Sequence, residues 1–353
     1  MKTKAFEQAC VDSQKKALSV ISEMKAGKVQ EGISFSEDIN SGKSTIREMI
    51  GTEDGAKEFL EKITFDLYTG REAVPLMYKS IYQTLVDANF PKTLTLNEFG
   101  PVSVVFLEHL EGDEVKFGTL EPGTQKVVSF VTYAAGIEYD EDILEYNQTW
   151  RISEIGLAFG EAYNKLLNHV HLNPIIAGTY ATTSATAATA REAQNGTGDY
   201  KNAAVAQLIA FNTSIATTLR QAMEVFPKGS IILANSVDQY ILEDALFGSL
   251  YSDDVTPTVV RRKFNPNEII YYDGSEVVVG GKTIEYDGVA SGFIYIIYPK
   301  TRFKEYIKHD LRVDSDDGDL SRLILAQVVG RSRRAVATTI ADKYGAIKVD
   351  IIT

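Results

Sequence analysis

The hydrophobic residues of this chain recur with a helical period in some segments and with a strand period in others. The clearest helical stretch has apolar residues at intervals of three and four, at Ile152, Ile155, Phe159, Ala162, Leu166 and Val170. Gly156 and Gly160 lie on one side of this stretch and predict that another segment packs closely there. The pattern predicts a helix over 148–172 that stops before Asn173-Pro174.

The first quarter of the chain has few long apolar runs. Residues 1–30 predict a polar amphipathic helix, and a glycine-spotted loop follows from Gly27 to Gly55. Residues 56–88 again have a helical pattern, interrupted by Gly70 and Pro75. Because little apolar surface is available for a core of its own, this region is expected to be an arm that packs on something else.

Strand-like runs follow at 102–107 and 126–133. The segment between them is polar and contains the turn Glu121-Pro122-Gly123, so the pattern predicts a long two-stranded hairpin. An isolated hairpin buries too little surface to be stable in water. This one is therefore expected to lie on a partner.

The second half of the chain predicts a separate module and a final group of strands. Residues 177–200 are rich in Ala, Thr and Gly and predict a flexible loop. The module that follows is expected to have a helix over 202–225, a strand over 231–234 and a helix to Gly248 that opens with the capping-box residues Ser236 and Gln239. It continues with strands separated by Asp273-Gly274, Gly280-Gly281 and Asp287-Gly288 and with an apolar strand over 292–298. The final group of strands is expected over 303–313, 320–330 and 346–352. Helices and strands are segregated, so the predicted class is α+β.

Composition narrows the function classes. The chain has 353 residues, 44% of them hydrophobic, which is enough for a sizeable core. Its only cysteine, Cys10, excludes an internal disulfide and fits a reducing compartment. No apolar run approaches the roughly 18 residues of a membrane helix, and the N-terminal residues do not resemble a signal peptide. A net charge of −12 repels duplex phosphates at long range, so sequence-specific DNA binding is not expected.

Residues 37–45, EDINSGKST, resemble the end of a phosphate-binding loop. A complete loop needs a glycine five residues before Gly42, and that position is Glu37. The preceding stretch, 28–35, is also not an apolar strand. A nucleotide-binding enzyme that uses Lys43 is therefore only a minor alternative, and a flexible turn with a helix cap is preferred.

Other chemical motifs are incomplete. The acidic run 314–319 has Val313 and Ile324 where a calcium-binding EF-hand loop needs acidic ligands, so an acidic solvated turn is preferred. His169 and His171 are two residues apart, so on a helix they diverge. No zinc-ligand set and no nucleophile elbow is present in the sequence. We expect no catalytic, cofactor-binding or metal-binding residues.

The order of these parts resembles the major capsid (major head) protein of tailed bacteriophages, with its Hong Kong 97-type fold. Three stretches carry the resemblance, which extends over residues 75–353: YAAGIEYDEDILEYNQTWRISEIGLAFGEAYNKLLNHVHLNPI, ANSVDQYILEDALFG and RVDSDDGDLSRLILAQVVGRSRRAVATTIADKYGAIKVD. Residues 133–175 resemble that family's passage from hairpin into spine helix. Residues 234–248 resemble a strand and helix of its axial domain, and residues 312–350 resemble its C-terminal strands.

The resemblance implies a domain layout. The implied parts are an N-terminal arm (1–75), a lead-in to the peripheral domain (76–100), an extended E-loop hairpin (101–135), a peripheral domain with the spine helix and a flexible loop (136–200), an axial domain (201–300), and C-terminal strands of the peripheral domain (301–353).

It also implies a structural, non-enzymatic function. The chain would assemble with itself into hexamers and pentamers of an icosahedral head that encloses double-stranded DNA, contacted non-specifically. Scaffolding, portal and decoration proteins would be further partners, a membrane would not, and no cofactor is implied. The location would be the virion capsid, and the bacterial host cytoplasm during assembly. An encapsulin-like compartment shell, which shares the fold, is the main alternative.

Seven residues are candidates for contacts between subunits: Glu111, Lys116, Glu121, Lys126, Arg331, Arg333 and Arg334. Some members of the family join a hairpin lysine covalently to a neighbour's asparagine. Lys116 and Lys126 are in the predicted hairpin, but ordinary solvated lysines are the preferred interpretation. The three arginines are expected to form either a solvated turn or a protein–protein contact.

Overall fold

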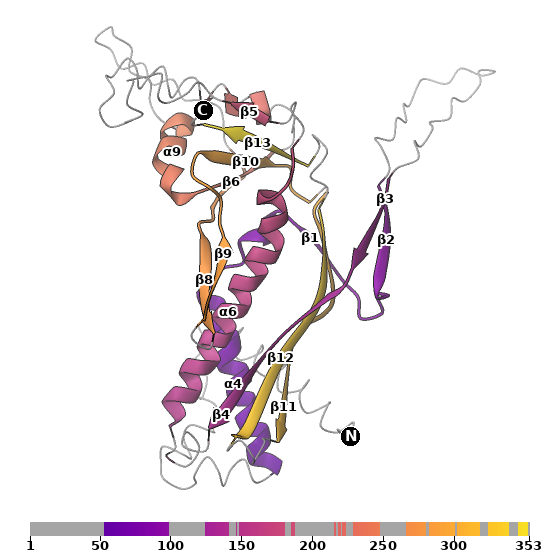
Figure 1. Ribbon diagram of the computed structural model, residues 1–353, viewed down its shortest axis with the longest axis vertical. Coiled ribbons are helices and arrows are strands. Elements are labelled where there is room, and N and C mark those ends of the chain that lie inside the picture. The colour runs from indigo at the N-terminus through magenta and orange to yellow at the C-terminus, as the bar shows by residue number, and fades with distance from the viewer. Residues whose placement is uncertain are drawn as a thin grey trace, which may run out of the picture.

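A long helix, α6 (Thr149–Ile176), runs along the middle of the molecule in the computed structural model (Figure 1). The structure describes residues 53–98, 124–140, 146, 148–180, 185–187, 215–216, 218–219, 221–223, 229–247, 266–279, 282–300, 302–317, 324–338 and 345–351. Other helical elements with described bounds are α4 (Glu53–Ala73), the short 3-10 helices η1 (Met77–Ser80) and η4 (Ser236–Asp238), and α9 (Gln239–Phe247). Residues 215–216, 218–219 and 221–223, within the helix predicted over 202–225, are also helical.

One side of α6 faces a four-stranded sheet with the order β1-β11-β12-β4. Its strands are β1 (Gln83–Val86), β4 (Val131–Asp140), β11 (Lys304–Asp317) and β12 (Ile324–Ala337). β1 is parallel to β11, and the other neighbours are antiparallel. The register of β11 on β12 shifts twice, between Ile307 and His309 and between His309 and Arg312, as expected for a bulged and strongly twisted pair.

A five-stranded mixed sheet covers the C-terminal end of α6, with the order β5-β13-β10-β6-β7. Its strands are β5 (Ala185–Ala187), β6 (Ile231–Ala234), β7 (Glu268–Tyr271), β10 (Phe293–Ile297) and β13 (Ala346–Asp350). α9 packs against this sheet through Leu242, Ala245 and Leu246, which belong to one buried cluster with Ile232 and Ile296. β13, the last of the described strands along the chain, also belongs to this sheet.

Two hairpins leave the sheets. β2 (Thr93–Glu98) pairs with β3 (Thr124–Ser129), and Figure 1 shows this pair diverging from the four-stranded sheet. We call the β2–β3 pair the stem. The second hairpin, β8 (Gly274–Val279) with β9 (Lys282–Asp287), extends from the five-stranded sheet along α6.

The structure corrects the expected N-terminal arm for the part of it that is described. α4 is a core helix, with Phe59, Leu60, Ile63 and Leu67 buried in the main cluster. It runs through Gly70 without interruption. Gly70 allows close contact with α6, because a Cβ there would lie 2.1 Å from the Leu157 carbonyl oxygen. The prediction that 56–88 is helical is wrong beyond Ala73, where η1 and β1 follow.

Close packing of α6 at its glycines is confirmed. A Cβ on Gly156 would lie 2.9 Å from the Asp66 Cβ, and one on Gly160 would lie 2.0 Å from the Leu67 carbonyl oxygen. The predicted stop of this helix is wrong, because α6 continues through Pro174 to Ile176. A proline so near the helix end removes one backbone hydrogen bond, and the burial of Leu172 and Ile175 keeps the last turn in place.

Most predicted strands are confirmed. β8 and β9 lie between the predicted turn pairs Asp273-Gly274 and Asp287-Gly288, and 231–234 and 292–298 contain β6 and β10. The third predicted turn pair, Gly280-Gly281, lies outside the described residues. The predicted cap before α9 is wrong in detail. Asn235 caps η4 by accepting from the Val237 backbone N–H, while the Ser236 hydroxyl donates to Asp273.

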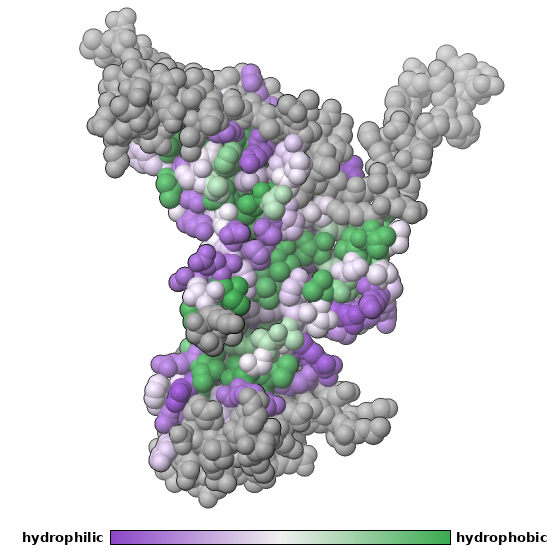
Figure 2. All heavy atoms as spheres, viewed as in Figure 1, coloured by the Kyte–Doolittle hydropathy of each residue, from purple (hydrophilic) through white to green (hydrophobic). Residues whose placement is uncertain are grey.

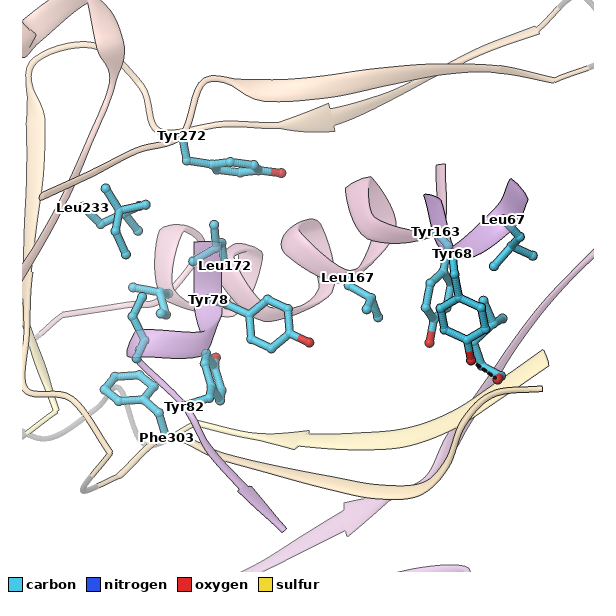
Figure 3. Close-up of a cluster of buried hydrophobic side chains, with 14 of the residues drawn as sticks. Leu67, Tyr68, Tyr78, Tyr82, Tyr163, Leu167, Leu172, Leu233, Tyr272 and Phe303 are labelled. Carbon is cyan, nitrogen blue, oxygen red and sulfur yellow. Dashed lines mark hydrogen bonds between the residues drawn. The ribbon is translucent and has the colours of Figure 1, made fainter. Parts of the chain in front are cut away.

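The main core lies on both sides of α6. Figure 3 shows Tyr78, Tyr82 and Phe303 on one side of the helix, with Leu233 and Tyr272 on the other. Tyr68 in α4 donates to the Leu311 carbonyl oxygen of β11. Within the described residues, no helix is long and apolar enough to cross a membrane.

Candidate functional site

The long strands β11 and β12 form a ribbon with two different faces. Side chains of a strand alternate between faces, and in β12 Ser332 and Arg334 are buried while Arg331 is exposed. The buried side chains point toward α6, and we call this the inner face. The alternate positions, beginning with Arg331 and Arg333, form the outer face.

Arg334 is at the centre of the inner face, and only 1% of it is exposed. Its Nη1 donates to Glu305 Oε1 at 2.6 Å, and its Nη2 donates to Asp310 Oδ1 at 2.8 Å and to the Tyr163 hydroxyl at 2.6 Å. Its Nε donates to the Ser332 hydroxyl at 3.1 Å. The guanidinium therefore joins β11, β12 and α6, and its fork geometry is suited to such a set of acceptors.

Glu305 also connects Arg334 to a second buried side chain, His171 of α6. His171 Nε2 lies 2.9 Å from Glu305 Oε1, and Nδ1 lies 2.7 Å from the Leu167 carbonyl oxygen. Both neighbours are acceptors, whereas a neutral imidazole has one N–H. Tyr78 of η1 stacks on the imidazole, with ring centroids 3.6 Å apart.

Burial and charge act in opposite directions within this network. Burial favours a raised pKa for Glu305, but the hydrogen bond and charge of His171 and the charge of Arg334 outweigh it and lower this pKa below the ordinary value. Burial also disfavours the charge of Arg334, yet Tyr163, Tyr78, Glu305 and Asp310 together raise its pKa. Burial raises the pKa of Tyr163 to about 12. Glu305 and Arg334 are therefore held as a charged pair.

The outer face carries the base of the stem at one end. Val128 and Phe130 are buried against Tyr306, Ala335 and Ala337. Phe90 packs on both Phe130 and Tyr306, with centroids 5.6 Å apart in each case. Lys308 Nζ donates to the Phe90 carbonyl oxygen at 2.5 Å. The stem is thus fixed to the sheet at its base.

Beyond the base of the stem, the outer face is basic. The register places His309 opposite Arg333 and Arg312 opposite Arg331. We call Lys308, His309, Arg312, Arg331 and Arg333 the basic strip. Burial lowers the pKa of His309, and the four neighbouring cations of the strip lower it further.

One carboxylate lies within the basic strip. Asp314 Oδ2 is 2.8 Å from Arg331 Nη2, and Asp314 Oδ1 is 3.5 Å from Arg312 Nε. Arg333 Nε is buried and has no hydrogen-bond partner among the described residues. Four cations and one carboxylate leave a formal local charge of about +3 on a chain whose net charge is −12.

Large apolar side chains are also exposed elsewhere on the molecule. Figure 2 shows apolar residues gathered in the middle of one face, at the level of β1 and the stem. Val86 of β1 is 72% exposed and Val127 of the stem 64%. In η4 and α9, which follow β6, Val237 and Tyr240 are 74% and 71% exposed. Exposed apolar and aromatic side chains of this kind are typical of surfaces that bind protein.

The predicted contact residues have different positions. Arg331, Arg333 and Arg334 belong to strand β12, so the expected solvated turn is wrong. Arg334 is buried within the chain. Lys126 is in β3, paired with Leu96. Glu111, Lys116 and Glu121 lie outside the described residues, as does the segment with Lys43.

The buried network itself was not predicted from the sequence. Glu305, Tyr78 and Asp310 are in segments whose pattern predicted only their secondary structure. Asn164, Asn168 and His171 are on the buried side of α6, where Asn168 accepts from the Met77 backbone N–H at 3.0 Å and donates to the Pro75 carbonyl oxygen. The signal in the sequence that could have revealed the network is the spacing of these three polar residues, which are three and four positions apart on a helix with an apolar pattern.

The described residues include no group of three His, Cys, Asp or Glu side chains arranged for a metal ion. The divergence of the two helix histidines is confirmed, since His171 contacts Glu305 and His169 stacks on Tyr286 of β9. Burial lowers the pKa of His169, and Asp287 opposes this shift.

A cavity of about 450 Å³ beside the network is lined by nine residues: Tyr68, Arg71, Glu72, Val74, Pro75, Leu76, Lys79, Asn164 and Asp310.

No protein-family model matches this sequence, and no curated protein sequence is similar to it. The structure is similar to several solved capsid structures. The mature capsid of bacteriophage PhiM1 has 13% sequence identity and a TM-score of 0.48, with 77% of this chain and 86% of that chain covered. The capsid of Myoviridae phage XM1 has 11% identity and a TM-score of 0.44, covering 78% and 92%.

A virus-like particle from Pyrococcus furiosus is also similar, with 10% identity, a TM-score of 0.46, and coverage of 82% of this chain and 98% of that chain.

Proposed function

We propose that this chain is the major capsid protein of a tailed bacteriophage, with a Hong Kong 97-like fold, and that it assembles with itself into hexamers and pentamers of an icosahedral head around double-stranded DNA. In this proposal α6 is the spine helix, and the four-stranded sheet with α4 is the peripheral domain. The five-stranded sheet with α9 is the axial domain, and the stem begins the extended E-loop. Because β4 is part of the sheet from Val131, the E-loop ends near residue 130.

The observation that carries the proposal is the stem. It is a two-stranded ribbon that diverges from the sheet, and Val127 in it is largely exposed. A two-stranded hairpin is at best marginally stable in water, because it buries too little apolar surface. A neighbouring copy that covers the stem would supply the missing burial. Repetition of that contact around closed symmetry would give a shell.

Exposed groups elsewhere support contacts with more than one neighbour. Val237 and Tyr240 project from the end of the axial domain, where copies would meet around a symmetry axis. Trp150, at the start of the spine helix, is 62% exposed, a large aromatic surface for a further contact. Soluble monomers rarely expose large aromatic side chains such as Trp150 and Tyr240 together with an uncovered two-stranded stem.

The charge of the chain suits a container for DNA. A net charge of −12 disfavours tight binding of the wall to packed duplex, so DNA contacts would be weak and non-specific. In this proposal the protein is located in the virion capsid, and in the bacterial host cytoplasm during assembly. Scaffolding, portal and decoration proteins would be its additional partners.

Deletion of residues 112–123 tests the proposal, because it removes the segment beyond the stem and leaves every described strand intact. We expect sedimentation velocity to show shells or capsomers for the wild type and only small species for the deletion variant. Circular dichroism should show an unchanged fold. Normal shells from the deletion variant would contradict the role of the stem.

A further inference from the structure

We infer that the cavity beside the buried network is a binding site for a free α-amino acid with a branched apolar side chain. The observation behind this inference is a pair of opposite charges, Arg71 of α4 and Asp310 of β11, which line the cavity without a hydrogen bond between them. The inference does not depend on assembly into a shell. It assigns a ligand to a part of the chain for which the proposed function names none.

Arg71 is held in place on the side away from the cavity. Its Nε donates to Asn164 Oδ1 at 3.2 Å, and its guanidinium carbon lies 5.1 and 5.0 Å from the ring centroids of Tyr68 and Tyr163 (Figure 3). Asn164 Nδ2 donates to the carbonyl oxygens of Arg71 and Val74, which fixes the backbone at the end of α4. The terminal nitrogens of Arg71 have no hydrogen-bond acceptor among the described residues. They form a fork that suits a carboxylate.

Asp310 is held through one of its two oxygens. Its Oδ1 accepts from Arg334 Nη2 at 2.8 Å and from the Tyr163 hydroxyl at 3.4 Å. Its Oδ2 has no hydrogen-bond donor among the described residues, and it lies 3.8 Å from Arg71 Nη1, which is beyond hydrogen-bond distance. An unused acceptor therefore lies beside unused donors at the wall of the cavity.

An α-amino acid has the two groups that this pair lacks. Its carboxylate and its ammonium group are attached to the same carbon atom, so they can reach two neighbouring groups of opposite charge together. The carboxylate would accept from the terminal nitrogens of Arg71, and the ammonium group would donate to Asp310 Oδ2. Charge-assisted hydrogen bonds are about twice as strong as neutral ones. Arg71 and Asp310 are already oriented by other partners, so binding costs little further ordering.

The rest of the lining favours an apolar side chain on the ligand. Val74, Pro75 and Leu76, in the segment after α4, contribute apolar surface. The volume of about 450 Å³ is within the range of small-molecule sites, which is roughly 300–1,000 Å³. A branched aliphatic side chain would occupy this apolar part while the charged end of the ligand contacts Arg71 and Asp310.

The charge of the lining favours a zwitterion over a simple anion or cation. Arg71 and Lys79 contribute +2 and Glu72 and Asp310 contribute −2, so the formal sum is zero. A ligand with only a carboxylate would place its charge beside Asp310, and one with only an ammonium group would place its charge beside Arg71. Like charges at such short range repel. A zwitterion places an opposite charge beside each residue.

Four ligands titrated into the wild-type chain by isothermal calorimetry test the inference without any mutation. L-leucine has all three features, whereas L-leucinamide lacks the carboxylate, 4-methylpentanoate lacks the ammonium group, and glycine lacks the apolar side chain. We expect L-leucine to bind about tenfold or more tightly than each of the others, because every missing group leaves a partner in the cavity unpaired. Absence of saturable L-leucine binding would overturn the inference, and so would equal binding of L-leucinamide or 4-methylpentanoate.

Two variants should each lose a different preference. Arg71→Gln should bind L-leucine and L-leucinamide equally, and Asp310→Asn should bind L-leucine and 4-methylpentanoate equally. A general loss of structure does not produce this pattern. Arg151→Gln and Glu154→Gln make the same changes of charge at exposed positions of α6 and should bind like the wild type. Folded Arg71→Gln and Asp310→Asn chains that keep the wild-type preferences would contradict the assigned contacts.

A third variant fills the cavity and keeps both charged groups. Val74→Phe, at a partly buried lining position, should lower the affinity for L-leucine by about tenfold or more. L-leucine should raise the melting temperature of the wild type with increasing concentration, and that of Val74→Phe much less. Unchanged L-leucine affinity of Val74→Phe would place the ligand elsewhere and overturn the inference. Shells from a chain that does not bind L-leucine would contradict only this inference, whereas binding by a chain that never assembles would contradict only the proposed function.

Discussion

Arg334 of β12 and Glu305 of β11 form a buried ion pair, with Nη1 and Oε1 2.6 Å apart. Arg334 is 1% exposed and Glu305 2%. The pair connects the four-stranded sheet to α6 through Tyr163 and His171. It therefore fixes the position of the sheet that carries the stem and the basic strip relative to α6.

Replacement of Arg334 by alanine should strongly destabilise the chain, because Glu305 and Asp310 would lose their shared partner. Removal of one member of a buried ion pair costs about 3–5 kcal/mol. Arg331→Ala removes an exposed arginine paired with Asp314 and should cost about 1 kcal/mol or less. Denaturant unfolding followed by circular dichroism measures both. Equal costs for the two variants would contradict the central role of Arg334.

Acid should weaken the fold partly through Glu305. Its pKa is lowered in the folded chain, so its stabilisation is fully present above the unfolded pKa of about 4.3 and is lost as pH falls through the lower folded value. We expect Glu305→Gln to lower the melting temperature most near neutral pH. The difference from the wild type should shrink below about pH 4.

Differential scanning calorimetry at several pH values measures this effect. Glu154→Gln, at an exposed position of α6, is the control, and its difference from the wild type should be small throughout. A deficit of the Glu305→Gln variant that stays constant from neutral to acid pH would show that charge on Glu305 is not the cause.

Packing of α4 on α6 should be sensitive to a single methyl group. A Cβ at Gly160 would lie 2.0 Å from the Leu67 carbonyl oxygen, so the two helices would have to separate. We expect Gly160→Ala to cost about 1–3 kcal/mol in unfolding free energy, despite the better helix propensity of alanine. Glu154→Ala on the exposed side of the same helix should change stability by about 0.5 kcal/mol or less. A stabilised Gly160→Ala variant would contradict the described packing.

Assembly should fail without loss of the fold when negative charge is placed on the exposed surface of η4 and α9. Val237 and Tyr240 are both more than two-thirds exposed, so Val237→Asp/Tyr240→Asp should leave the melting temperature nearly unchanged. The new carboxylates would be brought together around a symmetry axis and would repel. Size-exclusion chromatography with light scattering should show capsomers for the wild type and smaller species for the variant. Unchanged capsomers would remove this surface from the proposed contacts.

Local sequence pattern predicted most of the elements but not how they combine. The turn pairs around β8 and β9 and the apolar runs of β6 and β10 were sufficient, because those signals are local. α4 was mistaken for part of an arm, since its burial depends on Gly156 and Gly160 of α6, some 90 residues later. The end of α6 was misplaced because tertiary burial of Ile175 outweighs the local effect of Pro174.

The candidate site, too, was predicted only in part from the sequence. Arg331, Arg333 and Arg334 were grouped as one basic cluster, because sequence shows proximity along the chain. Strand alternation assigns Arg334 to the opposite face from the other two, and a strand had to be recognised there first. His171 and Glu305 are 134 residues apart, and only the assembled sheet brings them together.

Electron microscopy of the purified wild-type chain, and of lysates that co-express a scaffolding protein, tests the proposed function most directly. We predict closed icosahedral shells or free capsomers, with no such particles from the chain that lacks residues 112–123. A wild-type chain that is folded but remains monomeric in every such preparation would contradict the proposal that this protein builds a capsid.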